Sequence, residues 1–340
     1  MSEINNKFWT NKKVLITGHT GFKGSWLSLW LNYLKADVLG YSLPLSNKET
    51  LFKKFKLNTR IRSKFGDIRD YNLLKKTIKQ FNPTIVFHLA AQPLVIDSYI
   101  NPLDTFNTNI MGTANLMNAL TQSKGLESII LITTDKVYQN DERKKKFKED
   151  DKLGGDDPYS CSKAASELVI NSYSKSFYTK VGIATARSGN VIGGGDYAKN
   201  RIVPDILKAI NKKESLIIRN PKSTRPWQHV FETINGYLTL AEKVTKNKKK
   251  YSGSWNFGPS NHKITVSTLT KKLLKLSKSN IKLKQIQSAN YKEKKLLALD
   301  SSKANNVLSW SNKWNIEKSL EQIVDWNNNS LKRNISEYSL

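Results

Sequence analysis

The amino-acid sequence predicts an α/β fold with a doubly wound parallel sheet. Apolar runs of strand length alternate with helical patterns through the first half of the chain, which is typical of βαβ units. Glycines recur three residues apart at Gly18, Gly21 and Gly24, where the first apolar run meets a helical pattern. The 340 residues, 38% of them hydrophobic, can supply the core of about two domains or one large one.

The alternation predicts the individual elements in order. We expect strands at 14–17, 37–43, 64–67, 84–89, 128–134 and 181–187. We expect helices at 25–35, 71–80, 102–124 and 157–177. After residue 190, glycines at 193–195 and several prolines loosen the pattern, so we expect shorter elements there and a helix near 316–328.

The glycine-rich turn predicts a dinucleotide site. Gly18 permits a tight turn, Gly21 lets the backbone approach a pyrophosphate, and Gly24 lets the next helix pack closely. That helix would direct its positive N-terminal end at the phosphates. We therefore expect a dinucleotide-binding domain of the Rossmann type at 1–189, and at 190–340 mainly a smaller α/β substrate-binding cap, with some segments returning to the sheet. By itself, the glycine spacing also fits a tight turn without a ligand.

The composition excludes several classes of protein. Neither a run of about 18 apolar residues nor a signal-peptide pattern is visible, which predicts a cytoplasmic protein with no membrane partner. The single cysteine, Cys161, excludes an internal disulfide and is expected to be a small buried helix residue, and the histidines lack metal-ligand spacing, so we expect no metal. The net charge is +28, but the basic residues are spread along the chain. Their densest clusters, 143–146 and 246–250, are expected to be solvated loops, so we expect no nucleic-acid partner.

A tyrosine and a lysine four residues apart begin the helix expected at 157–177. Tyr159 and Lys163 then share one face of that helix. A phenol has a pKa near 10, and a neighbouring ammonium lowers that pKa because it favours the phenolate. Tyr159 is therefore a candidate base for an alcohol proton, although an isolated pair of this kind is more often an ordinary surface pair.

Polar residues end three successive strands. Asp67 and Ile68 end one, residues 89–92 end the next, and residues 133–136 end a third. Ligands of open α/β sheets bind beyond the carboxyl ends of strands, so we expect these residues to line one site. Taken singly, each group also fits a cap or a turn.

These motifs resemble the extended short-chain dehydrogenase/reductase superfamily, and within it the NAD-dependent epimerases and dehydratases. The resemblance rests on the glycine turn, Asp67-Ile68, residues 88–91 and Tyr159-x-x-x-Lys163. The segments 18–27, 90–95, 133–136, 189–196 and 225–230 are similar to the CDP-glucose branch of the sugar-nucleotide 4,6-dehydratases. Other branches carry a glutamate where this chain has Lys136, so that lysine points to the CDP-glucose branch.

The resemblance implies a lyase that converts CDP-glucose to CDP-4-dehydro-6-deoxy-glucose and water by internal hydride transfer through NAD. Tyr159, assisted by Lys163 and Thr134, would remove the 4-hydroxyl proton, and Asp135 would protonate the departing 6-hydroxyl. Asp135 needs a raised pKa for this role. Lys136 stands where the usual C5 base would be, but an ammonium beside a carboxylate favours ionisation of both, so it acts as that base or as a cation that polarises the ketone or stabilises an enolate.

The resemblance also implies the binding residues. Residues implied for NAD are Gly18, His19, Gly21, Phe22, Lys23, Gly24, Asp67, Ile68, Leu89, Ala90, Ala91, Thr133, Tyr159 and Lys163. Residues implied for the substrate are Gln92, Ser98, Asn190 and Arg225. Residues 40–44 hold neither an acid nor an arginine, so nothing there selects a 2′-phosphate and NAD is favoured over NADP.

Several alternatives stay open at this point. Lys23 contacts the pyrophosphate together with His19 or is a solvated first-turn residue, and Trp227 covers the base or belongs to the core. A sugar-nucleotide 4-epimerase would share the fold, NAD and the Tyr159/Lys163 pair, but it needs no acid or base at C5 and C6. A non-catalytic NAD- or nucleic-acid-binding protein would account for the charge. The resemblance further implies a homodimer through the helices at 102–124 and 157–177, and a part in deoxysugar synthesis for lipopolysaccharide.

Overall fold

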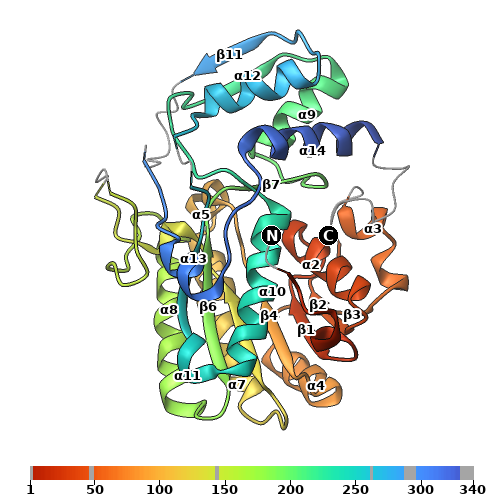
Figure 1. Ribbon diagram of the computed structural model, residues 1–340, viewed down its shortest axis with the longest axis vertical. Helices are drawn as coiled ribbons and strands as arrows, with labels where there is room; N and C mark the ends of the chain where they lie inside the picture. The colour runs from red at the N-terminus through yellow and green to blue at the C-terminus, as the bar shows by residue number, and fades with distance from the viewer. Residues whose placement is uncertain (1–2, 46–49, 142–144, 261–262, 287–295, 330–340) are drawn as a thin grey trace.

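Figure 1 shows the computed structural model, which describes residues 3–45, 50–141, 145–260, 263–286 and 296–329. Its main sheet has seven strands in the order β10-β6-β5-β4-β1-β2-β3, and each neighbouring pair is parallel. The strands are β1 (Lys13–Thr17), β2 (Asp37–Ser42), β3 (Arg62–Phe65), β4 (Ile85–His88), β5 (Ser128–Ile132), β6 (Gly182–Ser188) and β10 (Gly253–Phe257). The strand order reverses between β1 and β4, so the predicted doubly wound parallel sheet is confirmed.

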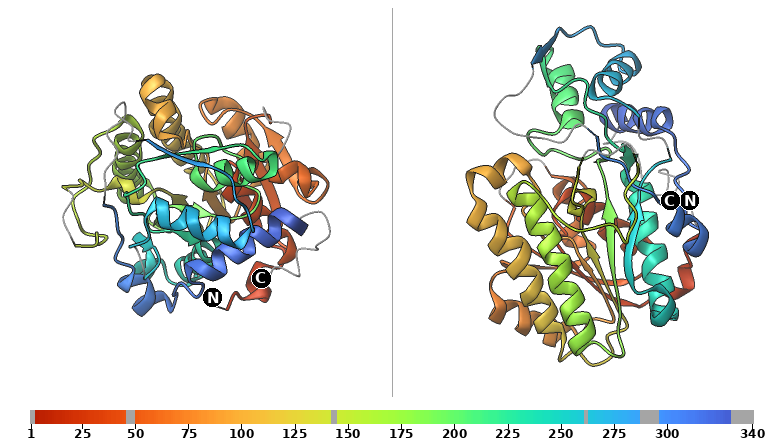
Figure 2. Two further views of the ribbon diagram at one scale, coloured as in Figure 1. Left: turned by 90° about the horizontal axis from the view of Figure 1, so that it is seen from above. Right: turned by 90° about the vertical axis from the view of Figure 1, so that its left-hand side faces the viewer.

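Helices cover both faces of this sheet, as an all-parallel sheet requires (Figure 2). One face carries α2 (Phe22–Tyr33) and α10 (Val230–Lys246), and the other carries α4 (Tyr71–Phe81), α7 (Gly112–Leu120) and α8 (Pro158–Phe177). The remaining helices and helical turns of the lower part are α1 (Asn6–Trp9), α3 (Leu51–Lys54), η1 (Leu57–Thr59), α5 (Val95–Ile100), α6 (Pro102–Phe106), η2 (Asn107–Met111), η3 (Asp135–Val137), α11 (Lys248–Tyr251) and α13 (Ser302–Leu308).

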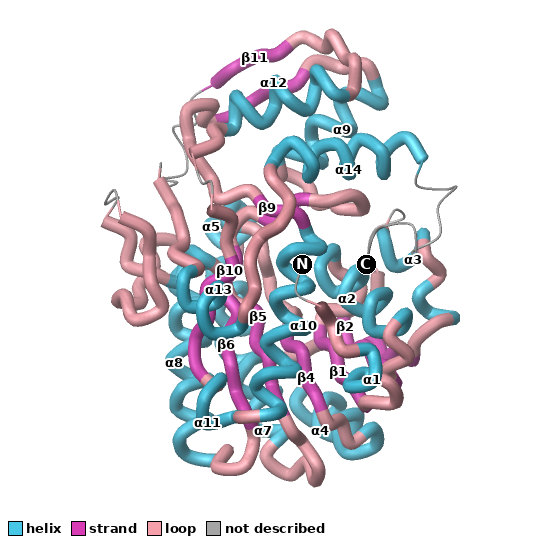
Figure 3. Tube along the Cα trace, in the orientation of Figure 1, coloured by secondary structure: helices cyan, strands magenta, loops and turns pink. Residues whose placement is uncertain are grey.

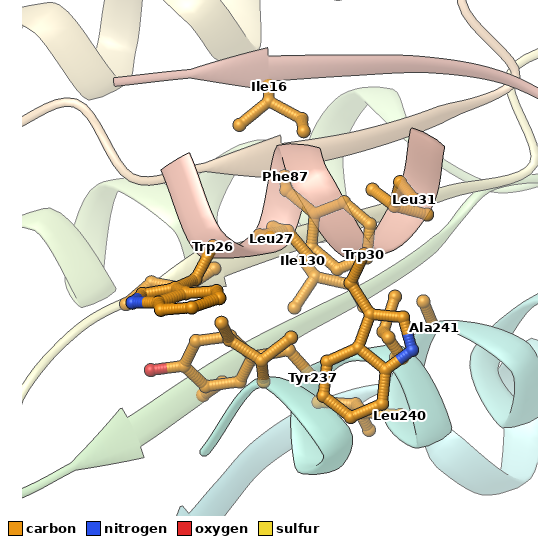
Figure 4. Close-up of a cluster of buried hydrophobic side chains, with 14 of the residues drawn as sticks. Ile16, Trp26, Leu27, Trp30, Leu31, Phe87, Ile130, Tyr237, Leu240 and Ala241 are labelled. Carbon is orange, nitrogen blue, oxygen red and sulfur yellow. The ribbon is translucent and has the colours of Figure 1, made fainter. Parts of the chain in front are cut away.

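The larger hydrophobic core lies between the sheet and helices α2 and α10 (Figure 4). Trp26 and Trp30 of α2 pack edge-on against Phe231 of α10, with ring centroids 4.8 and 6.1 Å apart. Burying a large apolar side chain contributes about 1.5–3 kcal/mol, so this contact holds α2, and with it the glycine turn, firmly on the sheet.

The sequence analysis did not predict α10, where only shorter elements were expected. The apolar residues at 230, 231, 234, 237, 238, 241 and 244 recur with a helical period, so a signal for this helix was present in the sequence and was overlooked. In the structure every residue from 230 to 242 is buried, polar ones included. Both α10 and β10 belong to the lower part of the molecule, although they follow residue 190.

An upper part forms its own hydrophobic cluster above the sheet (Figure 3). It contains α9 (Ile202–Lys212), α12 (Val266–Leu276) and α14 (Ile316–Asn329), with the parallel pair β8 (Leu216–Arg219) and β11 (Leu283–Ile286). The short strands β7 (Val191–Ile192) and β9 (Gln228–His229) pair below it. Helix α14 confirms the helix expected near 316–328.

Most expected elements differ from the structure by one or two residues at an end, and three differences bear on the site. Helix α2 begins at Phe22 rather than at residue 25, and β3 ends at Phe65, so Asp67 lies in the following turn. The helix expected at 102–124 is interrupted by a π-helical turn at η2 and ends at Leu120. That turn lets Asn109 bind the Gln92 amide and the Ser162 hydroxyl, each at 2.8 Å. Such widened turns are frequent at functional sites.

Further expectations from the sequence are corrected. The basic cluster at 246–250 ends α10 and forms most of α11, so it is helical rather than a loop, and residues 143 and 144 of the other cluster lie outside the described residues. Cys161 is exposed, because it lies on the outer face of α8. None of the described helices is long and apolar enough to cross a membrane.

Candidate active site

A cavity of about 1020 Å³ opens beyond the carboxyl ends of the parallel strands. Its wall combines the turn after β1, the segments that follow β3, β4, β5 and β6, and residues of the upper part. The sequence-predicted residues that line it are Gly18, Gly21, Phe22, Lys23, Gly24, Asp67, Ile68, Leu89, Ala90, Ala91, Gln92, Thr133, Thr134, Asp135, Lys136, Tyr159, Asn190 and Arg225. His19, Ser98 and Lys163 are buried and do not line it.

The glycine turn has the geometry that a dinucleotide site needs. Gly18 has a φ of +78°, and a Cβ there would lie 2.7 Å from the Ala90 amide nitrogen. A Cβ on Gly24 would overlap the Gly18 carbonyl oxygen, so the start of α2 packs directly on the turn. Gly21 caps α2 without a side-chain hydrogen bond, and the first turn has no acidic residue. The helix start therefore suits a phosphate.

Two glycine variants test how closely α2 packs on the glycine turn. We expect Gly24→Ala to lower the free energy of unfolding by about 1–3 kcal/mol, because its Cβ overlaps backbone. Gly21→Ala should cost less, since its Cβ would meet only the Gly18 oxygen at 3.4 Å and its φ is −73°. Urea unfolding followed by tryptophan fluorescence measures both. Equal midpoints for the two variants would contradict the close packing of α2 on the turn.

The His19 side chain points into the protein rather than into the cavity. Its Nε2 lies 3.2 Å from the Ser63 hydroxyl, and its ring meets Phe52 edge-on at 5.2 Å. Burial lowers the pKa of His19 to about 4, so the imidazole is neutral at pH 7. The sequence-based suggestion that this side chain contacts a pyrophosphate is therefore not supported by its position.

Asp67 is held at the cavity wall by an arginine that the sequence analysis did not single out. Arg69 donates to the Asp67 carboxylate at 2.6 Å and also to Asp104 at 2.6 Å. The hydrogen bond from Arg69 holds the pKa of Asp67 below its usual value. Ile68, the next residue, is buried and lines the cavity.

Tyr159 lies at the start of α8, where Asp157 caps the helix by accepting from the Ser160 amide at 2.9 Å. The phenol is buried and shares a hydrogen bond with Thr134. Burial raises the pKa of Tyr159 to about 12 and outweighs the opposite effect of Thr134. The lowered pKa predicted from the sequence is therefore wrong for this structure, because the desolvation of the phenolate is the larger effect.

Lys163 lies one helical turn further on and is also buried. Its Nζ donates to the Ile132 carbonyl at 3.3 Å. Burial lowers the pKa of Lys163 to about 8, against the charge of Glu167, which raises it. An ammonium with this pKa is still mostly protonated at pH 7.

Asp135 is a buried carboxyl with one oxygen left unpaired. Thr134 Oγ1 donates to Oδ1 at 3.1 Å, whereas Oδ2 has no hydrogen-bond partner among the described residues. Oδ2 lies beside Gly189, where a Cβ would come within 2.7 Å of it. Burial raises the pKa of Asp135 to about 6, against the charges of Lys136 and Arg225. The structure therefore provides the raised pKa that an acid at this position requires.

Lys23 is neither solvated nor directed at the helix start. Its Nζ donates to the Tyr237 hydroxyl of α10 at 3.3 Å, and Tyr237 in turn lies 2.8 Å from the Ser188 hydroxyl. Burial lowers the pKa of Lys23 to about 7, and the charges of Lys163 and Arg201 add to this effect. The sequence analysis missed Tyr237 because it did not predict α10.

Of the other predicted residues, some lie in the cavity wall and Ser98 lies away from it. Gln92 is tied to its own segment, since its side chain accepts from the Leu94 amide at 2.6 Å, and Ser98 donates to Val95. Arg225 is buried at the cavity wall. Trp227 also lines the cavity, but it is buried in the upper cluster and donates to the Ile264 carbonyl at 3.0 Å, so the core interpretation is confirmed.

Two arginines missed from the sequence line the upper side of the cavity. Arg201 pairs with Asp196 at 3.0 Å, and Arg219 donates to Asn200 at 3.1 Å. Together with Arg225 they bring three guanidinium groups to one cavity, which suits a diphosphate. A weak signal was present, because all three lie in the segment where we expected the substrate-binding part. No group of three His, Cys, Asp or Glu side chains within the described ranges could hold a metal ion.

A parallel Rossmann sheet whose cavity is lined by a glycine turn, Tyr159 and Thr134, with Lys163 buried one helical turn beyond Tyr159, defines an extended short-chain dehydrogenase/reductase. The chain belongs to the GDP-mannose 4,6 dehydratase family, whose model matches residues 15–323.

Curated relatives and solved structures agree with this assignment. The chain is 43% identical over 331 residues to CDP-glucose 4,6-dehydratase of Salmonella typhimurium, covering 95% of this chain and 92% of the relative. It is 29% identical over 277 residues to human dTDP-D-glucose 4,6-dehydratase, covering 78% and 74%. UDP-glucose 4-epimerase of Thermotoga maritima with UDP-glucose shares the fold at a TM-score of 0.81, with 22% identity and coverage of 94% and 99%. dTDP-glucose 4,6-dehydratase of Bacillus anthracis in complex with NAD does so at 0.79, with 20% identity and coverage of 94% and 96%.

Proposed function

We propose that the protein is an NAD-dependent hydro-lyase that converts CDP-glucose to CDP-4-dehydro-6-deoxy-glucose and water. The choice of substrate is supported by the 43% identity to a CDP-glucose 4,6-dehydratase over 95% of the chain. One structural observation supports the reaction above all: Thr134 links the buried phenol of Tyr159 to the buried carboxyl of Asp135. This series of hydrogen bonds connects Tyr159, which suits removal of an alcohol proton, to Asp135, which suits protonation of a leaving hydroxyl.

The cofactor residues fit NAD. The Gly18 turn and the unobstructed N-terminus of α2 would hold the pyrophosphate, while Asp67 and Ile68 would flank the adenosine side. NAD held there would supply the acceptor for a hydride from C4 of the sugar and the donor that returns it to C6. Lys163, which is buried behind Tyr159, would help to hold the nicotinamide end of NAD.

The proposed proton chemistry uses three neighbouring side chains. Tyr159 takes the 4-hydroxyl proton, a base removes the C5 proton, and Asp135 gives a proton to the departing 6-hydroxyl, which leaves as water. A proton returns to C5 when C6 is reduced. Thr134 has one hydroxyl hydrogen, and when it is directed at Asp135 the hydrogen between Tyr159 and Thr134 Oγ1 is the one that the phenol donates. The proton from O4 can thus pass through Tyr159 and Thr134 to Asp135, where it replaces the proton that Asp135 gives to the departing hydroxyl. The water that leaves therefore consists of the 6-hydroxyl group and a proton that came from O4.

The two pKa values decide when this transfer occurs. With a pKa near 12 for Tyr159 and near 6 for Asp135, moving a proton from the phenol to the carboxylate costs about 8 kcal/mol of free energy. The transfer must therefore accompany oxidation of the sugar rather than precede it. Lys136 follows Asp135 in the turn η3 and lines the cavity, where it is the proposed C5 base or the cation that polarises the ketone or stabilises an enolate.

Separate incubation with CDP-, dTDP-, GDP- and UDP-glucose tests this function. We expect NMR to show a 4-keto-6-deoxy sugar from CDP-glucose alone. Formation of CDP-galactose without a keto sugar would establish the 4-epimerase alternative. NAD binding without any product would leave the non-catalytic alternative. Gln92, Ser98, Asn190 and Arg225 remain the proposed substrate residues, joined by Arg201 and Arg219.

We further infer a homodimer built on the face formed by α6, η2 and α8. Leu103, Met111 and Leu168 of these adjacent elements are 76%, 52% and 60% exposed. A second copy of this chain would cover these apolar side chains. The cytoplasmic location, the lack of nucleic-acid binding and the part in lipopolysaccharide synthesis stay predictions.

Leu168→Glu should convert this dimer to a monomer, because two copies would bring added charges into an apolar interface. Light scattering after gel filtration should give about 38.7 kDa for the variant and twice that mass for the wild type. Leu276→Glu, at an exposed position of α12, is the control and should remain dimeric. A monomeric wild type would refute the interface.

A further inference from the structure

Helix α8 carries three ionisable side chains at four-residue intervals, Tyr159, Lys163 and Glu167, so that they lie along one face. The proposed reaction uses the first two and gives no role to the third. Glu167 is nevertheless buried, with 5% of its surface exposed. A carboxylate in that position needs a structural or functional reason.

Glu167 is held by a charged donor, Arg187 of β6, and by a neutral donor, Thr133, which directly follows β5. Its Oε1 accepts from Arg187 Nε at 2.8 Å and from the Thr133 hydroxyl at 2.7 Å, and its Oε2 accepts from Arg187 Nη2. The Arg187 side chain is equally buried, and its Nη1 donates to the Tyr138 hydroxyl at 2.7 Å. A buried ion pair of this kind contributes little to net stability, since desolvation offsets the attraction. The place of this ion pair in the molecule, rather than its contribution to stability, therefore needs an explanation.

The pair is connected to Lys163 in two ways. Thr133, which donates to Glu167, directly follows Ile132, whose carbonyl accepts from Lys163 Nζ at 3.3 Å. The charge of Glu167 also opposes the burial that lowers the pKa of Lys163.

The other ionisable groups around Lys163 do not supply a compensating negative charge. His88 of β4 is neutral, because burial lowers its pKa to about 3, and Tyr159 of α8 is protonated at neutral pH. Lys23 of α2 is a second amine, whose own pKa is lowered by the charge of Lys163. Of the described groups that act on Lys163, Glu167 is thus the one that favours its charged form.

We propose that Glu167, oriented by Arg187 and Thr133, is a positioning residue that keeps the Lys163 ammonium charged and in place behind Tyr159. Glu167 acts through Lys163 and does not touch the substrate. The consequence for catalysis rests on the proposed function, because it assumes that Tyr159 works with a protonated Lys163. The effect on Lys163 itself does not depend on that assumption.

Glu167→Gln tests the proposal by pH dependence. The charged form of Lys163 is lost as the pH rises through its pKa, about 8 in the wild type. Removing the negative charge lowers that pKa by about 1–3 units, so the alkaline limb of kcat moves to lower pH by the same amount. We expect kcat at pH 8.5 to fall about tenfold or more relative to the wild type, with a much smaller loss at pH 6. A merely structural loss would lower kcat equally at both pH values and would overturn the proposal.

A matched control and a second variant guard against misfolding. Glu127→Gln removes a carboxylate that pairs with Lys12 away from the cavity, and it should leave the pH profile unchanged. Glu167→Gln leaves Arg187 buried without its counter-charge, so the double variant Glu167→Gln/Arg187→Gln removes both charges. It should shift the alkaline limb in the same direction, but by less than Glu167→Gln, because the unpaired Arg187 charge is also absent.

A direct titration separates this proposal from the proposed function. In protein labelled with ¹³C at the lysine ε-carbon, the resonance of Lys163 is the one that disappears in Lys163→Arg. Its titration midpoint should fall in both Glu167 variants, whether or not the protein acts on CDP-glucose. An unchanged midpoint would overturn the role of Glu167, whereas a shifted midpoint in a protein without dehydratase activity would overturn only the proposed function.

Discussion

Tyr159→Phe is expected to lower kcat for CDP-glucose by about 10²–10⁴-fold, because it removes the group that accepts the 4-hydroxyl proton. The ring would keep its buried position at the start of α8, so the fold and the affinity for NAD should change little. Initial rates of keto-sugar formation and calorimetric titration with NAD measure the two effects separately.

Tyr178→Phe is the matched control for this variant. Tyr178 is also buried and follows the other end of α8, where its hydroxyl donates to the Met117 carbonyl rather than to a cavity residue. It should retain the wild-type kcat. If Tyr159→Phe kept more than a tenth of the wild-type rate, another group would have to take the O4 proton.

Asp135→Asn is expected to stop the reaction after the first oxidation. Asparagine has no acidic proton for the departing 6-hydroxyl and cannot receive the O4 proton through Thr134, so product formation should fall by about 10²–10⁴-fold and the first oxidation should also become slower. In a single turnover, absorbance at 340 nm should show reduced cofactor that forms and is not consumed. Rapid product formation without this accumulation would remove Asp135 from the role of acid.

The same variant has an expected effect on stability that serves as its folding control. The pKa of Asp135 is raised from 3.8 to about 6 by burial, so its ionised form disfavours the folded state. This cost is absent below pH 4, develops as the pH rises to 6 and is complete at pH 7, where it amounts to about 3 kcal/mol. Relative to the wild type, Asp135→Asn should therefore raise the free energy of unfolding more at pH 7 than at pH 4. Equal differences at the two pH values would contradict the raised pKa.

The sequence predicted the parts of the molecule that depend on local pattern. The parallel sheet follows from apolar runs alternating with helical patterns, and the turn at Gly18 follows from residues that tolerate a positive φ and close backbone contact. The Tyr159/Lys163 pair follows from helical spacing. Since strand tips of a parallel sheet meet at one edge, the order of the segments also predicted that Asp67, Gln92 and Asp135 would line one cavity.

The sequence could not predict contacts that join distant segments. Apolar residues at helical spacing mark α10, but its burial over residues 230–242 and the contact between Lys23 and Tyr237 depend on how α10 packs against α2 and the sheet. The position of His19 depends on Phe52 and Ser63, which come from separate elements. The break at Asn109 in the expected long helix depends on its bonds to Gln92 and Ser162.

By itself, then, the sequence determined the fold class, the dinucleotide-type turn and the candidates for the acid-base groups, because these depend on residue type and on spacing along the chain. Only the tertiary structure decided how those groups ionise and which neighbours hold them. Burial raises the pKa of Tyr159 where the sequence predicted a lowered one, and it gives Asp135 the raised pKa that its proposed role requires. The physical reason is that desolvation and charge interactions depend on distances across the folded molecule, which spacing along the chain does not specify.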